Sequence, residues 1–216
     1  MKNYFNQKKN LWLLLVVLSL VFFGFYFLDQ FFSTFLTEDQ NNKIYRPIRT
    51  LTDLGEALHF FIFAIGIWIF SVWALRAKKS WNFLNTEKIE SLRRWSSSLF
   101  YSLLVSGLIV HLLKFVFGRL RPHRSLERDP FQFDPFNFHH YNHSFPSGHA
   151  QTLFVVATAL SMAQPKWQAW FYGSAIILSL TRVVLHAHFF SDVVFGAYLG
   201  FIVTVLIYKA YRNTLK

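Results

Sequence analysis

Three short polar clusters interrupt a sequence that is otherwise strongly apolar. They are Lys114 with Arg121 and Pro122, then Pro146-Ser147-Gly148-His149, and finally Arg182 with His188 and Asp192. Lysine and arginine bind phosphate oxygens, and histidine beside a carboxylate can act as a nucleophile or as a general acid or base. The residue types therefore indicate chemistry on a phosphoryl group.

The cationic members of the clusters suit the binding of that group. Lys114, Arg121 and Arg182 supply three cationic donors, which match the equatorial oxygens of a phosphoryl group during transfer. Lys114 and Arg121 are seven residues apart, about two helical turns, so a continuous helix projects both from one face. Because these side chains already offset the phosphate charge, we expect neither a metal ion nor another cofactor to take part.

The histidines supply the groups that react. His188 and Asp192 have i, i+4 spacing, so the carboxylate can bind one ring nitrogen while the other attacks phosphorus. His149 can protonate the departing oxygen and then activate water. Ser147 and Gly148 stand where a helix is predicted to begin, and a hydroxyl with free backbone N–H groups suits a phosphate anion there.

The overall composition restricts the class of protein. The chain is 53% hydrophobic and 15% charged, its mean hydropathy is +0.29, and it contains no cysteine. These values exclude a disordered chain, a disulfide-stabilised secreted domain and a cysteine nucleophile.

Six apolar runs predict the elements that position the clusters. They cover residues 11–28, 57–75, 95–113, 150–163, 167–180 and 193–208. Runs of this length approach the thickness of the hydrocarbon core of a bilayer. We therefore predict an all-α integral membrane bundle of six transmembrane helices, a single domain over residues 1–216 with its motifs between 114 and 192.

The first apolar run also has features of a secretory signal peptide, because Lys2, Lys8 and Lys9 form a basic leader before it. The run is long, however, it is rich in phenylalanine at its end, and no cleavage site of small residues follows it. We predict that it is an uncleaved first helix.

The distribution of lysine and arginine predicts the orientation of the bundle. With the N-terminus inside, the inner segments hold thirteen basic and two acidic residues, whereas the outer segments hold nine of each. The net charge of +11 is therefore interpreted as a topology signal and not as a nucleic-acid-binding one. Both termini are predicted to face the cytoplasm, and all three polar clusters then fall at helix ends on the outer face.

In their order and spacing the clusters resemble the motifs of the type 2 phosphatidic acid phosphatases, which share their site with glucose-6-phosphatase and the vanadium haloperoxidases. The family pattern is K-x6-R-P, then P-S-G-H, then S-R-x5-H-x3-D. This sequence departs from it only at Thr181, which keeps the hydroxyl of serine. The resemblance implies a metal-independent reaction in which His188 forms a phosphohistidine intermediate and His149 is the acid.

Several other residues near the clusters have two interpretations. Arg119, Arg124 and Arg128 either bind an anionic headgroup or are solvated charges close to lipid phosphates. His186 competes with His188 for the role of nucleophile, but it stands six residues before Asp192, off the helical face, so His188 is preferred.

Two further groups lie in the predicted outer loops. One consists of three histidines, His139, His140 and His143. They have the spacing of metal ligands but lack a neighbouring cysteine or carboxylate pattern, so a place near the mouth of the site or in a plain loop is favoured. The other consists of Phe31, Phe32 and Phe35. They suggest a segment on the bilayer surface or, alternatively, packing over the bundle.

Together these features predict a lipid phosphatase of a bacterial inner membrane with its site facing the periplasm. Phosphatidylglycerophosphate, phosphatidic acid, undecaprenyl pyrophosphate and lipid A phosphate all offer the required group. The expected partners are this lipid and the bilayer, and not nucleic acid. Two alternatives stay open. A transporter or channel with a His, Arg and Asp proton relay would spread its charges through the membrane, and an inactive lipid-binding protein would lack part of the motif set.

Overall fold

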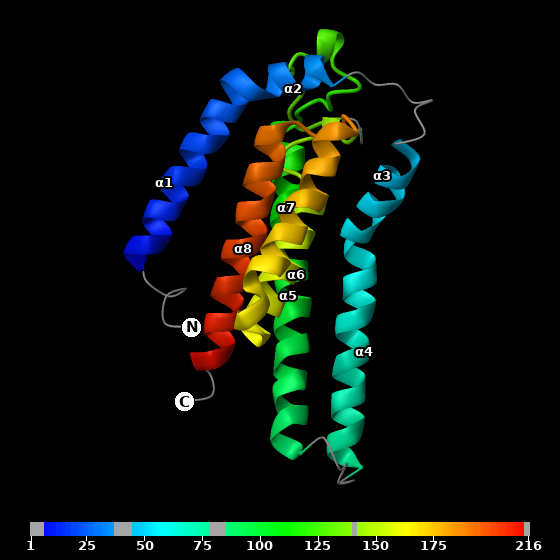
Figure 1. The fold of residues 1–216 in the computed structure, drawn as a ribbon, viewed down its shortest axis with the longest axis vertical. Helices are drawn as coiled ribbons and strands as arrows, with labels where there is room; N and C mark the ends of the chain where they lie inside the picture. The colour runs from blue at the N-terminus through cyan, green and yellow to red at the C-terminus, as the bar shows by residue number, and fades with distance from the viewer. Residues whose placement is uncertain (1–6, 37–44, 78–84, 140–141, 214–216) are drawn as a thin grey trace.

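The computed structural model describes residues 7–36, 45–77, 85–139 and 142–213, and six helices in these ranges form a bundle (Figure 1). They are α1 (Gln7–Phe23), α4 (Ala57–Arg76), α5 (Thr86–Phe117), α6 (Gly148–Ala163), α7 (Gln168–Val184) and α8 (Phe190–Asn213). The shorter elements are the π-helix η2 (Gly24–Leu28), the α-helices α2 (Asp29–Phe35) and α3 (Tyr45–Thr52), and the 3-10 helices η3 (Asp53–Gly55), η4 (Leu126–Arg128) and η6 (Pro165–Trp167). The predicted all-α fold with six helices is confirmed.

Among the described residues, four helical segments are long and apolar enough to cross a membrane. They are Leu11–Phe35, Tyr45–Arg76, Thr86–Phe117 and Phe190–Tyr211. α6 and α7 are not among them, because their 16 and 17 residues give only about 24–26 Å of helix. Of the basic residues behind the predicted orientation, Lys2, Lys78, Lys79 and Lys216 lie outside the described residues.

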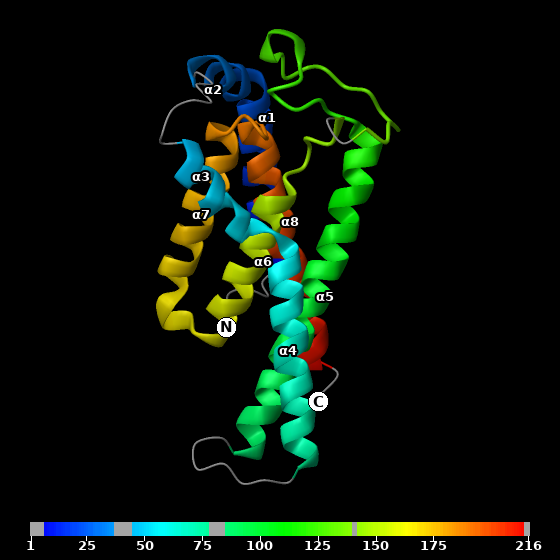
Figure 2. The same cartoon turned by 90° about the vertical axis from the view of Figure 1, so that its right-hand side faces the viewer.

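The two ends of the bundle carry different features. In Figure 1 α1 begins about half-way along the bundle and rises to the upper end, α8 descends from the upper end, and the loop between α5 and α6 lies at the upper end. The π-helix η2 stands where α1 passes into α2, and α2 crosses the upper end. The helix ends that carry the three polar clusters also point upward (Figure 2).

Capping residues at both ends of α5 determine where the first cluster lies. The side chain of Asn85 accepts a hydrogen bond from a backbone N–H of the first turn (2.9 Å), so α5 begins well before the predicted apolar run. At the other end Gly118 has a φ of 59°, and its N–H bonds to the carbonyl of Lys114 (2.9 Å). A Cβ on Gly118 would lie 1.8 Å from the carbonyl oxygen of Asp134. Glycine is therefore required where α5 ends and the loop carrying Arg121 begins.

The central helix is α6, which packs against α5, α7 and α8 (Figure 2). Small side chains make up much of its buried surface, including Ala150, Ala157, Thr158 and Ser161. In a membrane bundle small residues let backbones approach closely, and this contact holds the helices together. The start of α6 is thereby fixed among three neighbouring helices.

Two glycines on α8 allow a close approach to the start of α6. A Cβ on Gly196 would lie 2.3 Å from the carbonyl oxygen of Ser147, and one on Gly200 would lie 2.2 Å from that of Gln151. Their spacing is the G-x-x-x-G pattern of closely packed membrane helices. At the same contact the N–H of Ser147 donates to the carbonyl of Asp192 (3.0 Å). The glycines therefore hold the second and third polar clusters together.

Replacement of Gly196 by Ala is expected to destabilise the protein by about 1–3 kcal/mol, because the added carbon overpacks this contact. Gly107 on α5 is the matched control, since a Cβ there meets nothing within 4 Å and alanine is favoured inside helices. Thermal unfolding in detergent measures both variants. Equal unfolding temperatures for the two would contradict the close approach of α8 and α6.

Candidate active site

All eight residues predicted for the site lie at the upper end of the bundle. They come from the end of α5 and the loop after it, the start of α6, the end of α7 and the region where α8 begins: Lys114, Arg121, Ser147, Gly148, His149, Arg182, His188 and Asp192. The ammonium nitrogen of Lys114 is 3.8 Å from the position of a Cβ on Gly148, which joins the first cluster to the second. The bond between Ser147 and Asp192 joins the second to the third.

A cavity of about 610 Å³ lies at this site. Arg121, His149 and Arg182 line it. The side chains of Lys114 and His188 are only 8% and 2% exposed. The site is thus a polar cavity with buried cationic and nucleophilic groups next to it.

The proton on His188 can be assigned from its hydrogen bond. Nδ1 lies 2.8 Å from the backbone carbonyl oxygen of Ser144. A carbonyl oxygen only accepts, so Nδ1 of the neutral ring carries the hydrogen and donates it. The lone pair is then on Nε2, which is the form that an attacking imidazole requires.

Asp192 acts on this ring differently from the sequence expectation. Its carboxylate was expected to bind a ring nitrogen directly, but Oδ2 lies 3.8 Å from Nδ1 of His188. Oδ2 instead accepts hydrogen bonds from the Ser144 hydroxyl (2.6 Å) and from the backbone N–H of Phe189 (2.9 Å). Ser144 therefore connects the carboxylate to the ring, with its hydroxyl on Asp192 and its carbonyl on His188.

Neither interpretation of Arg119 is correct. The side chain is 1% exposed, so it is not a solvated charge, and it does not line the cavity. Its guanidinium forms ion pairs with Asp192 (2.5 Å) and Asp29 (2.8 Å) and donates to the hydroxyl of Ser191 (2.8 Å). The guanidinium carbon also lies 4.2 Å from the centroid of the Phe189 ring. The reason for the difference is burial, because a buried guanidinium must be paired with carboxylates.

Asp29 completes this buried ion group and was missed at the sequence level. It lies at the start of α2, where Oδ1 accepts from the N–H of Ser191 (2.9 Å) and Oδ2 from its hydroxyl (2.6 Å). A lone carboxylate directly after a long apolar run is costly in a membrane, and this position in the sequence could have identified Asp29 as a candidate. The first helical segment is thus tied to the start of α8, close to His188 in the sequence.

The arginines of the cavity are influenced by neighbouring charge and by contacts with α3. Burial lowers the pKa of Arg121 from its ordinary value, while the negative charge of Asp192 raises it. Arg182 donates to the hydroxyl oxygen of Thr52 (3.4 Å), and the Thr181 hydroxyl lies 2.9 Å from the same oxygen. Residues near the end of α3 therefore contact the site.

The second cluster forms the start of α6, as predicted. Ser147 is the N-cap residue, and its hydroxyl accepts from the N–H of Ala150 (3.4 Å). Gly148 and His149 are the first residues of the helix, where backbone N–H groups are free to bind an anion. A Cβ on Gly55 would lie 3.0 Å from the His149 ring, so the turn after α3 packs on this histidine.

Arg124, Arg128 and His186, for which the sequence left two roles open, are not among the eight predicted site residues. Arg128 donates to the backbone carbonyls of Ser33 (2.6 Å) and Leu36 (3.1 Å), which fastens the outer loop to α2. Arg124 is exposed and lines the cavity. His186 is 1% exposed and has a φ of 49°, and its backbone carbonyl accepts a hydrogen bond from Nδ1 of His123 (2.9 Å).

The outer-loop histidines and phenylalanines are placed only in part. Nε2 of His143 lies 3.0 Å from the carbonyl of Asn137, and the N–H of His139 donates to the Asn137 side chain (2.8 Å). His140 lies outside the described residues. Phe31 and Phe35 are exposed and stack on each other, whereas Phe32 packs against the buried cluster of Ala150, Val183 and Val193.

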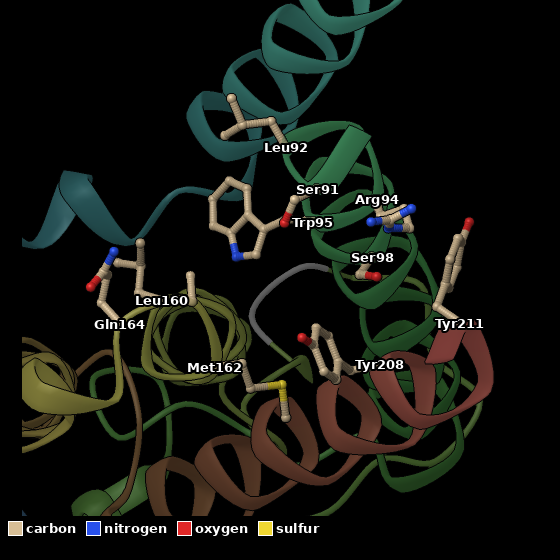
Figure 3. A pocket seen from close by; sticks show the side chains of 11 residues that line it. Ser91, Leu92, Arg94, Trp95, Ser98, Leu160, Met162, Gln164, Tyr208 and Tyr211 are labelled. Atoms are coloured by element: carbon tan, nitrogen blue, oxygen red, sulfur yellow. The ribbon is translucent and has the colours of Figure 1, made fainter. Parts of the chain in front are cut away.

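A second cavity, of about 620 Å³, lies away from this chemistry (Figure 3). Its lining comes from the first turns of α5 and the last turns of α6 and α8, and includes Arg94, Trp95 and Tyr208. Arg94 is paired with Glu90 (3.1 Å), and the Trp95 ring N–H donates to a carbonyl of α6 (2.8 Å). None of the eight predicted residues lines it, so its size does not make it the active site.

His188 is expected to stay neutral well below its ordinary titration range. Burial, together with the charges of Arg121 and Lys114, lowers the pKa of His188 well below 6.5, although Asp192 opposes the shift. The neutral form of His188 therefore persists when the pH falls through 6.5 and is lost only at lower pH. NMR titration of ¹³C-labelled histidine measures this, with the resonance assigned by its absence in His188→Gln. Protonation of that resonance near pH 6.5 would contradict the burial.

Comparison with known proteins supports the family resemblance. Residues 95–216 match the PAP2 superfamily. The lipid A 1-phosphatase of Rhizobium etli is 33% identical over 157 residues, which cover 68% of this chain and 66% of that protein. The lipid A 1-phosphatase of Rhizobium johnstonii is 39% identical over 102 residues, covering 47% and 42%. The chain thus spans between about two fifths and two thirds of the length of these curated relatives.

The fold is also similar to that of a solved membrane enzyme. The transmembrane PAP2-type phosphatidylglycerolphosphate phosphatase from Bacillus subtilis superposes with a TM-score of 0.64 at 20% identity, covering 96% of this chain and 98% of that one. Since the matching segment contains more than half of the chain and all eight motif positions, the chain belongs to the PAP2 superfamily.

Proposed function

We propose that the protein is an integral-membrane, metal-independent phosphatase that acts on a phosphorylated lipid at the outer face of the membrane. One observation carries the proposal above all. Nδ1 of His188 donates to Ser144, which leaves the lone pair of Nε2 for attack, next to a cavity lined by Arg121, His149 and Arg182. Family membership supports the same reaction.

In the first step the lipid phosphate binds among Lys114, Arg121 and Arg182. Their positive charges offset the charge that spreads over the phosphoryl oxygens. Nε2 of His188 attacks phosphorus, an N–P bond forms, and the bond from phosphorus to the lipid oxygen breaks. His149 gives its proton to that oxygen, and the dephosphorylated lipid leaves.

In the second step water hydrolyses the phosphohistidine. His149, now neutral, accepts a proton from water as the water oxygen attacks phosphorus. The N–P bond breaks, inorganic phosphate leaves, and His188 is again neutral at Nε2. Asp192 steadies the ring through Ser144 while positive charge develops on it.

The proposed membrane arrangement has six spans, of which α6 and α7 are the two shorter ones, with both termini in the cytoplasm and the site toward the periplasm. The directions of α1, which rises to the upper end, and of α8, which descends from it, support this arrangement (Figure 1), as does the positive charge of the inner segments. The buried charged side chains of the described residues, Asp29, Lys114, Arg119, Arg121 and Asp192, gather at the upper end. This grouping favours a site at one face over a relay across the membrane.

The test is phosphate release by the purified protein in detergent, with and without EDTA. The candidate substrates are phosphatidylglycerophosphate, phosphatidic acid, undecaprenyl pyrophosphate and lipid A phosphate. We expect release from at least one of them and no loss of rate in EDTA. Absence of release from all four, or loss of activity on chelation, would overturn the proposal.

A further inference from the structure

The active-site cavity contains more arginine than one phosphoryl group requires. Five arginines line it: Arg46, Arg49, Arg121, Arg124 and Arg182. Arg121 and Arg182 belong, with Lys114, to the proposed cradle of the reacting phosphate. Two carboxylates, Asp53 and Glu56, also line the cavity, so the arginines exceed the acidic residues by three.

Helix α3 brings two of the additional arginines to the cavity. Arg46 and Arg49 are three residues apart on α3, so they lie on one face of that helix. α3 packs against α7, and its last residue, Thr52, accepts a hydrogen bond from Arg182 (3.4 Å). The turn that follows packs on the His149 ring through Gly55. α3 is therefore fixed to residues of the reacting group.

The additional arginines are available to a ligand. Within the part of the chain that the structure describes, no ion pair joins Arg46, Arg49 or Arg124 to a carboxylate. All three side chains are exposed toward solvent although they line the cavity. The cavity volume of about 610 Å³ equals that of about twenty water molecules, which is room for more than one phosphate group.

We propose that Arg46, Arg49 and Arg124 form a second anion site that binds a second phosphate on the same lipid substrate. This inference rests on the proposed function and narrows its candidate substrates to lipids with two phosphate groups. The second phosphate is either joined directly to the first, as in a diphosphate, or attached to a neighbouring carbon of the headgroup. Arg46 and Arg49 on α3 lie outside the residues that match the PAP2 superfamily, so the match assigns no role to these two arginines.

The test compares lipids with one and two phosphates on Arg46→Gln/Arg49→Gln. Farnesyl phosphate and farnesyl diphosphate form one pair, and dodecylglycerol 3-phosphate and its 2,3-bisphosphate form the other. Because guanidinium–phosphate contacts are charge-assisted, we expect kcat/KM on a two-phosphate lipid to fall by about tenfold or more, mainly through KM. On the one-phosphate lipids we expect less than about a threefold change. The pair that shows the loss identifies which arrangement of phosphates the site binds.

Arg76→Gln/Arg93→Gln is the charge-matched control, because both arginines are exposed at the other end of the bundle. Restoration of most of the rate by Arg46→Lys/Arg49→Lys supports a charge effect. Equal loss on one- and two-phosphate lipids, or no loss on either, overturns the second anion site.

Binding separates this inference from the proposed function. The dissociation constant of non-hydrolysable farnesyl methylenediphosphonate is measured on the parent protein and on Arg46→Gln/Arg49→Gln, with farnesyl phosphonate for comparison. A rise of about tenfold for the diphosphonate alone supports the second site even if no lipid is hydrolysed. An unchanged constant overturns it even if hydrolysis is found.

Discussion

Replacement of His188 by Ala is expected to lower kcat/KM for phosphate release by about 10⁴-fold or more, because removal of a nucleophile eliminates the covalent route. The expectation follows from the 2.8 Å contact of Nδ1 with the Ser144 carbonyl, which assigns the ring hydrogen to Nδ1 and leaves the lone pair on Nε2. The change leaves the charges of Lys114, Arg121 and Arg182 in place. Binding of a phosphonate lipid should therefore change little while the rate disappears.

Chemical trapping distinguishes the nucleophile from its neighbour. With a ³²P-labelled lipid and a rapid quench at alkaline pH, which preserves phosphohistidine, label should appear on the parent protein and on His186→Ala. It should be absent from His188→Ala. Label on His188→Ala, or its loss only in His186→Ala, would assign the reaction to the other histidine.

Replacement of Arg119 by Leu is expected to cost about 3–5 kcal/mol of stability, the largest effect on folding that we predict. Without the guanidinium, the carboxylates of Asp29 and Asp192 lie buried and uncompensated, each less than 2% exposed. The variant is therefore expected to unfold at much lower temperature and to release little phosphate. Thermal unfolding in detergent and phosphate release measure the two effects.

Arg128→Leu is the matched control for Arg119. Arg128 also joins the outer loop to α2, but it donates only to backbone carbonyls. Its loss leaves no carboxylate buried without a partner, so a smaller effect is expected. If Arg119→Leu and Arg128→Leu unfold at the same temperature, the predicted contribution of the buried ion group to stability is wrong.

Arg119→Lys then tests whether the ion group positions the reacting residues. Lysine keeps the charge but lacks the planar fork that reaches both carboxylates. We expect a folded protein whose kcat falls while KM for the lipid stays close to that of the parent, because Arg119 does not line the cavity. A change in KM alone would place Arg119 in substrate binding instead.

The sequence alone predicted the six helices of the bundle, and it named the residues that we propose to react. Apolar runs of this length form membrane spans as helices, because a helix pairs its backbone groups within one segment and leaves none unpaired in the hydrocarbon core. Lys114, His149 and His188 were recognisable because charged and titratable groups are costly beside a membrane and are kept where chemistry needs them. Alternation of helix direction then placed all three clusters at the same end of the bundle.

Only the tertiary structure showed which groups support these residues. The i, i+4 spacing of His188 and Asp192 predicted a direct bond, but Ser144, which is 44 positions from His188 in the sequence, stands between them. Arg119 and Asp29 pair across 90 positions. Such contacts depend on how α2, the outer loop and α8 pack, and local spacing carries no information about packing between distant segments. The sequence determined which residues could react, and the packing of distant segments decided which proton, partner and charge each of them has.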